Sequence, residues 1–338
     1  MRVFVGKVES NNISDAVRAA LHWINWETIV PMGSHVFIKP NLTWVSHLPG
    51  ITTSPAFLSA LVELIRERTR NITIGESDRG YNSFKADEAF RGHGLDQLAS
   101  RYGVKLINLS TLPAEERTGV VAGRAVTVRL PRYLLRDVEV FLTAPVPKIH
   151  ATTGVSLGLK NQWGCIPDAM RLREHAEFDG KIVLINKLLR PKMVLFDGLY
   201  FLDKTGPLVG EPVCMNLVVA SDDVGAGSMA FCEIMGVDPF SVKHQVVARK
   251  EGLFPASLRE VAINTDLSVF RQRSFRLERT PMNWVAFAAF NSRLLTKVIY
   301  DSRFADWAHL VLYKIRHWKL FSRLAYGRLG APPIEGHR

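Results

Sequence analysis

Short apolar, strand-like runs alternate with amphipathic helical segments along the first third of the chain, and this alternation constrains the fold more than any other feature. The strand-like runs occupy Arg2–Lys7, 35–42 and 71–78, and helical patterns occupy 13–26 and 54–69 between them. A helix that connects two strands of one sheet leaves them parallel, with a right-handed crossover. The order predicts an α/β fold with a mostly parallel sheet and flanking helices. Further strand-like runs follow at 104–109, 125–130, 138–144, 193–196 and 216–220.

Polar side chains follow the ends of many of these predicted strands. In open α/β sheets, ligands bind beyond the carboxyl ends of parallel strands, where the connecting loops meet. We therefore expect side chains that are distant in sequence to meet at this edge of the sheet. The residues concerned are Lys39, Asn41, Glu76, Asp78, Asp197 and Asp223.

The stretch 145–167 carries the densest set of chemically capable side chains. Lys148 and His150 follow the strand-like run 138–144, and Lys160 and Asn161 follow ten residues later. Three glycines in the stretch allow the backbone to approach a ligand closely. This stretch is predicted to be the working surface of the protein. The glycines are Gly154, Gly158 and Gly164.

The segment that follows this stretch adds positive charge. Arg171 and Arg173 precede His175 within a predicted helical turn at 170–175. Close spacing on one turn is expected to hold these three groups near the site. His175 is interpreted as an anion contact rather than a catalyst.

Composition describes an ordinary globular body followed by a basic tail. Of 338 residues, 47% are apolar and 22% are charged, which indicates a folded chain. Residues 271–338 hold 13 Lys and Arg against 4 Asp and Glu, so they carry +9 of the net charge of +11. We predict an α/β domain over 1–270 and a basic, amphipathic helical tail of one or two helices over 271–338. Such a tail would bind an anionic membrane surface or a partner protein through 275–329, or it would instead form a helical cap over the sheet.

The cysteines and the hydropathy pattern bear on the cellular compartment. Cys165, Cys214 and Cys232 form no CxxC pair, so we expect neither a disulfide framework nor an iron–sulfur cluster in this chain. Charged residues at Lys7 and Glu9 interrupt any signal peptide, and no transmembrane helix is predicted. A cytoplasmic location fits best.

Several motifs together resemble the domain of unknown function 362 (DUF362) family, over roughly residues 34–236. The resemblance implies an α/β fold and a bacterial or archaeal source, but the family has no settled general activity. Some relatives carry ferredoxin-type cysteine motifs that this chain lacks. An aspartate expected shortly after Asp223 is also missing, which weighs against a two-carboxylate metal site there. The motifs are 38–41 (Ile-Lys-Pro-Asn), 147–150 (Pro-Lys-Ile-His), 158–167, 197–198, 206–210 and 220–223.

The candidate catalytic residues are Lys148, His150 and Asn161. A lysine among other cations can have its pKa lowered toward neutrality, where imidazole already titrates, so Lys148 or His150 could move a proton. Asn161 and nearby backbone amides could stabilise an oxyanion. The alternative is that Lys148 is a solvated loop charge and His150 a core histidine. Candidate substrate-binding residues are Lys39, Asn41, Lys160, Arg171 and His175.

Two other site hypotheses remain open at this point. A divalent metal could bind among Glu76, Asp78, Asp197 and Asp223, since Mg²⁺ and Mn²⁺ prefer oxygen ligands, although aspartates at strand ends often serve as helix caps. Cys165 could be a nucleophile, but a single cysteine is more often buried packing.

The leading functional hypothesis is a cytoplasmic enzyme that binds a small anionic metabolite, a phosphate or a carboxylate, at the carboxyl edge of the sheet. The alternative is a non-catalytic anion-binding or scaffold protein, docked to the inner membrane surface by the tail. Nucleic acid is an unlikely partner, because the basic residues lie on apolar helical segments.

Overall fold

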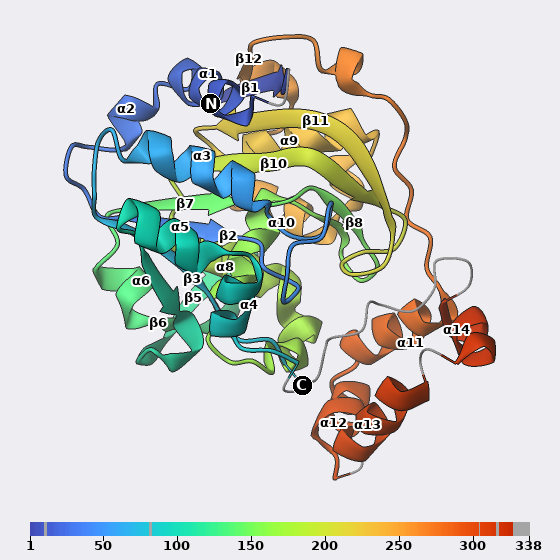
Figure 1. Cartoon of the computed structure of the whole chain (residues 1–338). Helices are drawn as coiled ribbons and strands as arrows, with labels where there is room; N and C mark the ends of the chain where they lie inside the picture. Colours follow the sequence, from blue (N-terminus) through green and yellow to red (C-terminus); the bar gives the residue numbers. More distant parts are fainter. Residues whose placement is uncertain (10–11, 81–82, 304, 316–317, 327–338) are drawn as a thin grey trace.

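The central sheet organises the chain, as the computed structural model shows for residues 1–9, 12–80, 83–303, 305–315 and 318–326 (Figure 1). Ten strands form this sheet, and its main path runs β12-β1-β11-β10-β7-β2-β3-β4. The predicted α/β class with a mostly parallel sheet is confirmed. The strands of the path are β1 (Arg2–Lys7), β2 (Val36–Pro40), β3 (Ile72–Glu76), β4 (Lys105–Asn108), β7 (Val140–Ala144), β10 (Met193–Asp203), β11 (Glu211–Ser221) and β12 (Ala262–Ile263).

The strands β7, β2, β3 and β4 form the parallel half of the sheet. Every residue of β2, β3 and β7 is buried, as expected for strands that are covered on both faces. Successive side chains of β2 enter different cores: Phe37 packs on one face, whereas Val36 and Ile38 pack on the other. The register places Lys39 beside Thr143 at the carboxyl ends of the strands.

A long antiparallel hairpin separates β1 from the parallel half. β10 pairs with β11 from Val194 to Asp203, and β1 pairs antiparallel with the far side of β11. The runs 193–196 and 216–220 predicted only the buried cores of these strands. β1 has the predicted bounds, and three strands separate it from β2.

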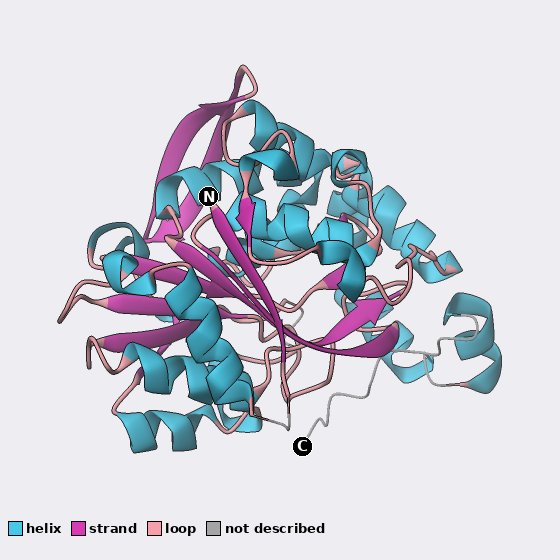
Figure 2. Ribbon diagram, turned by 90° about the horizontal axis from the view of Figure 1, so that it is seen from above, coloured by secondary structure: helices cyan, strands magenta, loops and turns pink. Residues whose placement is uncertain are grey.

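Helices cover both faces of the sheet (Figure 2). On one face α1 packs against α3, and Ser54 caps α3 at the start of the helical pattern 54–69, its Oγ accepting a hydrogen bond from the Phe57 amide. The helices of this face are α1 (Ile13–Trp23), α2 (Trp26–Ile29), α3 (Pro55–Ile65), α4 (Ala86–Gly92) and α5 (Leu95–Tyr102). On the other side lie α6 (Arg132–Arg136), α7 (Gly158–Asn161), α8 (Phe178–Leu189), α9 (Val224–Met235) and α10 (Lys243–Lys250).

A second, two-stranded sheet lies outside the main one. The expected strand 125–130 is part of β6 (Arg124–Pro131), which pairs with β5 (Ala114–Val121) and packs against α8. β5 was missed because Glu115, Glu116 and Arg117 interrupt its apolar pattern. The short strands β8 (Lys148–His150) and β9 (Gly154–Ser156) pair with each other and extend the edge of β10.

The C-terminal extension forms a helical group beside the sheet (Figure 1). Four short helices occupy its described residues, in place of the predicted one or two: α11 (Pro281–Phe290), α12 (Arg293–Asp301), α13 (Ala305–Ile315) and α14 (Lys319–Tyr326). Residues 327–329 of the predicted binding tail lie outside the described part. Among the described residues, no helix is both long enough and apolar enough to span a bilayer.

Polar contacts tie the start of this extension to the body. The Arg273 guanidinium lies 2.8 Å from Asp203, and Arg279 Nε donates to the Ala151 carbonyl at 2.7 Å. Lys204 and Glu278 form a further ion pair at 2.5 Å. The extension thus passes directly beside the residue that follows His150.

Candidate functional site

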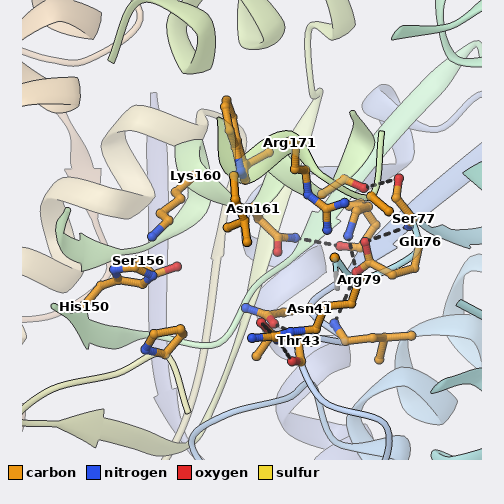
Figure 3. A pocket seen from close by; sticks show the side chains of 18 of the residues that line it. Asn41, Thr43, Glu76, Ser77, Arg79, His150, Ser156, Lys160, Asn161 and Arg171 are labelled. Carbon is orange, nitrogen blue, oxygen red and sulfur yellow. Dashed lines mark hydrogen bonds and ion pairs between the residues drawn. The ribbon is translucent and has the colours of Figure 1, made fainter. Parts of the chain in front are cut away.

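The predicted edge of the sheet contains a cavity of about 190 Å³ (Figure 3). Its walls are formed by the loops that follow β2 and β3, by the short strands β8 and β9, and by the segment from α7 to residue 175. Of the sequence-predicted residues, these line it: Lys39, Asn41, Glu76, Lys148, His150, Lys160, Asn161, Arg171 and His175. Asp78, Asp197 and Asp223 are not among the described lining residues.

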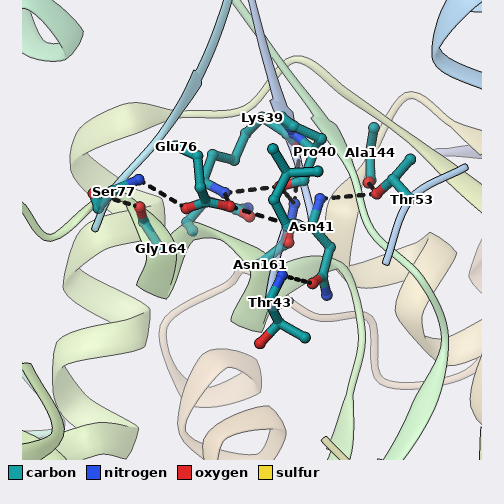
Figure 4. Close-up of polar contacts among 12 residues, drawn as sticks. Lys39, Pro40, Asn41, Thr43, Thr53, Glu76, Ser77, Ala144, Asn161 and Gly164 are labelled. Atoms are coloured by element: carbon teal, nitrogen blue, oxygen red, sulfur yellow. Dashed lines mark hydrogen bonds and ion pairs between the residues drawn. The ribbon is translucent and has the colours of Figure 1, made fainter. Parts of the chain in front are cut away.

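Lys39 and Glu76 form a buried ion pair at one side of the cavity (Figure 4). Lys39 Nζ lies 2.6 Å from Glu76 Oε2 and donates a second hydrogen bond to the Pro40 carbonyl at 2.7 Å. Glu76 also accepts the amides of Leu42 and Ser77. The charges of this pair therefore neutralise each other, and Lys39 is a structural cation rather than a free anion contact.

Gly164 is required where α7 leads into the next turn. A Cβ atom at this position would lie 2.7 Å from Glu76 Oε1 and 3.0 Å from Lys39 Nζ. The backbone therefore closes over the ion pair only because residue 164 has no side chain. The Gly164 carbonyl accepts a hydrogen bond from Ser77 Oγ, which fixes this approach.

Asn161 holds the end of β2 in place. Its Nδ2 group donates to the Lys39 carbonyl at 2.9 Å and to Thr143 Oγ1 at 2.8 Å. An amide nitrogen with both hydrogens engaged has none left for an oxyanion. The geometry thus gives Asn161 a positioning role and leaves its predicted catalytic role without a donor.

Lys148 is buried, and it has no carboxylate partner among the residues that the structure describes. Its side chain is 1% exposed, and its Nζ donates a hydrogen bond to the Ile51 carbonyl. Burial, with a smaller contribution from the positive charge of Arg79, lowers the pKa of Lys148 from 10.5 to about 7. The alternative interpretation of a solvated loop lysine is incompatible with this burial.

His150 lies beside Lys148 on β8 and is also buried. Its Nδ1 atom lies 3.3 Å from the Thr152 amide, which can only donate, so the neutral ring carries its proton on Nε2. Burial lowers the pKa of His150 well below 6.5, and the nearby charge of Lys160 lowers it further. The ring is therefore neutral at physiological pH.

Lys160 reaches the same corner from α7. Its Nζ donates to Thr153 Oγ1 at 2.8 Å and lies 5.5 Å from the centre of the Phe178 ring. Burial, and secondarily the charge of Lys148, lowers the pKa of Lys160 well below 10.5. Figure 3 shows Lys160, His150 and Ser156 together on one side of the cavity.

Two guanidinium groups complete the positive wall. Arg171 Nη1 donates to the Asp78 carbonyl at 2.8 Å, and Arg79 donates to the Thr43 carbonyl and hydroxyl. Both remain charged at any physiological pH. Arg173, expected beside Arg171, is exposed and is not among the residues that line the cavity.

Sequence reasoning missed Arg79 and Ser156. Arg79 directly follows Asp78 after β3. The search for polar residues beyond strand ends would have found Arg79 if it had been extended by one residue. Ser156 faces Lys148 across the β8–β9 register, which no local sequence signal reveals.

Asn41, which was predicted, accepts the Thr43 amide through Oδ1, and its Nδ2 makes no hydrogen bond within the described part of the chain.

His175 belongs to an aromatic cluster between the cavity and the C-terminal extension. Its ring stacks on Phe178 at 5.5 Å and on Phe290 of α11 at 4.4 Å between centroids, and Trp163 meets its edge at 5.4 Å. Burial lowers the pKa of His175 to about 3. The neutral ring therefore offers an apolar wall instead of the predicted anion contact.

The four carboxylates considered for a metal have separate roles. Asp78 accepts the Ala86 amide, Asp197 accepts the Ser54 amide at 2.6 Å, and Asp223 caps α9 through the Ala226 amide at 2.7 Å. Glu76 is held by Lys39. Within the described ranges, no group of three or more His, Cys, Asp and Glu side chains could hold a metal ion.

Cys165 has no access to solvent in this structure. Its side chain is fully buried, and burial raises its thiol pKa to about 12. A thiol in this environment does not form the thiolate that nucleophilic chemistry requires. The packing interpretation of Cys165 therefore fits the structure, and the nucleophile interpretation does not.

The cavity as a whole carries an excess of cationic groups. It is lined by Lys148, Lys160, Arg79 and Arg171. Glu76 is the one carboxylate among its described lining residues, and it forms an ion pair with Lys39. An arrangement of this kind favours an anion. It also includes one amine, that of Lys148, whose pKa of about 7 lies close to neutral pH.

Similar proteins provide limited functional information. The thylakoid-associated protein sll1697 of Synechocystis sp. is 26% identical over 244 residues, covering 68% of this chain and 71% of that protein. The lactate racemase apoprotein of Thermoanaerobacterium thermosaccharolyticum is 14% identical with a TM-score of 0.48, over 70% of this chain and 57% of that one.

A Thermotoga maritima protein of known structure is 11% identical with a TM-score of 0.36, over 62% of this chain and 55% of that one. The chain thus spans little more than half the length of these two solved structures. The family model described as "Domain of unknown function (DUF362)" matches residues 36–233, which is more than half of the chain. The protein is therefore a member of the DUF362 family.

Proposed function

We propose that the protein is an enzyme that binds a small anionic metabolite, a phosphate or a carboxylate, and moves a proton with Lys148. The observation that carries this proposal is a buried lysine that lines the cavity, has a pKa of about 7 and meets no carboxylate in the described part of the chain. General acid–base catalysis is most efficient when the pKa of the catalytic group lies near the working pH.

The surrounding residues divide into binding and positioning groups. Lys160, Arg171, Arg79 and the free amide of Asn41 bind the anion. Neutral His150 presents its Nε2–H as a hydrogen-bond donor to the anion. The contacts of Lys39 and Asn161 support a positioning role for both residues, because these contacts fix the end of β2 at the cavity.

Anion binding is coupled to proton uptake in this proposal. Burial lowers the pKa values of both Lys148 and Lys160, and the charge of Lys148 lowers the pKa of Lys160 further. A bound anion stabilises their charged forms and raises both pKa values. Calorimetry in buffers of different ionisation enthalpy should therefore show protons taken up when sulfate binds at pH 8.

Mass spectrometry of small molecules that co-purify with the intact protein tests the proposal directly. Phosphorylated or carboxylated metabolites should be retained by the wild type and lost from Lys148→Met. Equal retention by the Lys148→Met variant, or no retained anion together with no sulfate binding by calorimetry, would refute the assignment.

A second candidate function is a non-catalytic anion-binding protein docked at the inner membrane surface. The observation that favours it is the exposure of large apolar side chains on the basic C-terminal extension, including Leu294 (72%), Trp307 (65%) and Leu320 (74%). Apolar and basic residues on one segment are typical of peripheral binding to anionic lipid. The name of the Synechocystis relative, a thylakoid-associated protein, agrees with it.

Flotation with phosphatidylglycerol-containing vesicles tests this second candidate. The wild type should float and the Trp307→Ser/Leu320→Ser variant should not, whereas the control Met32→Ser/Val120→Ser, which changes exposed apolar residues of the α/β body, should still float. Absence of the wild type from the vesicle fraction would exclude membrane docking.

A further inference from the structure

A second cavity lies next to the anion site, between the α/β body and the C-terminal extension. It measures about 360 Å³, and the extension closes it with Phe287 and Phe290 of α11. Its remaining apolar walls come from the segment after β7, the start of α8, the loop after α9 and the approach to α11. These residues are Ile149, Phe178, Val237, Val242, Phe275 and Leu277.

The two cavities share a thin partition. His175 lines both of them, with its ring held between Phe178 and Phe290. Thr153 lines the second cavity, and its hydroxyl accepts the hydrogen bond from Lys160 Nζ, which lines the first. A ligand whose charged group reaches Lys160 therefore has its other end within reach of the aromatic chamber.

The chemistry of the second cavity differs from that of the first. Phe178, Val242 and Phe275 are buried, so the chamber presents apolar surface that gains nothing from a small polar metabolite. Arg279 lies over the Phe287 ring at 4.5 Å, with its Nε committed to the Ala151 carbonyl. The lining also includes polar side chains beside this apolar surface, among them Asp179, Lys243 and Asn291.

We propose that the ligand of the anion site is an anionic amphiphile, with its charged group among Lys148, Lys160 and Arg171 and its apolar part in the chamber between α8 and α11. This inference rests on the proposed anion binding and names the class of ligand. The C-terminal extension then serves as a wall of the site, and the stacked His175–Phe290 pair joins the two.

Titration calorimetry of the full chain with methyl, butyl, hexyl and octyl sulfate, below their micellar concentrations, tests the inference. All four probes carry the same charge, so differences in affinity report the alkyl chain alone. Each methylene that enters the chamber should raise the affinity by about three- to fourfold, up to the length that fills it.

A matched pair of valine variants locates the alkyl chain. Val237→Asn places a polar amide in the chamber wall and should remove most of the gain for octyl sulfate, while leaving the affinity for methyl sulfate unchanged. Val269→Asn, at a valine that is 65% exposed and does not line the chamber, should behave as the wild type.

The outcomes separate the two proposals. Equal affinities for methyl and octyl sulfate would overturn the amphiphile and leave the anion site standing. A chain-length gain that survives Val237→Asn would place the alkyl chain elsewhere and also overturn it. Absence of binding by every alkyl sulfate and by sulfate itself would remove the anion site and, with it, this inference.

Discussion

Two lysines of the same site, Lys39 and Lys148, are each 1% exposed but have opposite surroundings. Lys39 has Glu76 at 2.6 Å, whereas Lys148, within the described ranges, has the Ile51 carbonyl and nearby positive charge but no carboxylate. Burial alone therefore does not decide what a lysine does. A paired lysine stabilises the fold as an ion, and an unpaired one holds its proton weakly enough to exchange it.

The largest effect should come from breaking the paired lysine. Glu76→Gln leaves the Lys39 ammonium buried without a counter-ion, so the free energy of unfolding should fall by about 3–5 kcal/mol. Urea denaturation measures this change, with Glu63→Gln, at an exposed glutamate of α3, as the control. A loss below about 1 kcal/mol would show that the pair is not a structural element.

The unpaired lysine should reveal itself in the pH dependence of stability. The folded pKa of Lys148, about 7, lies below its unfolded value of 10.5. Between these values the unfolded chain binds more protons, so stability rises with pH. Relative to Lys148→Met, the wild type should gain up to about 1.4 kcal/mol per pH unit above pH 7.

Urea denaturation of the wild type and of Lys148→Met at pH 7, 8 and 9 measures this difference. The other titrating groups are common to both proteins and cancel in the comparison, apart from Lys160 and His150, whose pKa values the Lys148 charge lowers. Parallel pH profiles would mean that Lys148 is as strongly basic in the folded protein as in the unfolded chain.

The same lysine should control anion affinity. Sulfate does not titrate near neutral pH, so a change in its affinity with pH reflects a change in the protonation of the protein. The affinity of the wild type should fall about tenfold between pH 6 and pH 8, as the Lys148 charge is lost. Lys148→Met should bind weakly with little dependence on pH, and calorimetry that finds equal slopes would contradict the role of this residue.

The smallest effect concerns a carboxylate away from both lysines. Asp223→Ala removes the cap of α9 and should lower the free energy of unfolding by about 1 kcal/mol. Sulfate affinity should not change, because Asp223 does not line the cavity. A change in sulfate affinity would show that this carboxylate acts at the site after all.

The sequence predicted those parts of the fold that depend on local patterns. The bounds of β1 and the Ser54–Pro55 start of α3 follow from strand alternation and capping chemistry. β5 and the full length of the β10–β11 hairpin did not follow, because their outer residues are polar or half-exposed and their pairing is not local. The C-terminal extension likewise divides into shorter helices than its aromatic spacing indicated.

The site was predictable in its location but not in its pairings. Strand-end reasoning identified Lys39, Lys148, His150 and Lys160, and the structure places all four at one cavity. Lys39 pairs with Glu76, whereas Lys148 has no carboxylate partner among the described residues. This difference depends on the register of β2 and β3 and on the path of the loop after β7, which cannot be predicted from one sequence. The stacking of Phe290 on His175 is equally non-local.

The titration of Lys148 itself tests the account most directly. In protein labelled with ¹³C at the lysine ε-carbons, the signal that disappears in Lys148→Met should titrate with a midpoint near pH 7. Saturating sulfate should move this midpoint upward, because the bound anion stabilises the ammonium form. A midpoint above pH 9 in the free protein would contradict the central claim that this buried lysine exchanges its proton near neutral pH.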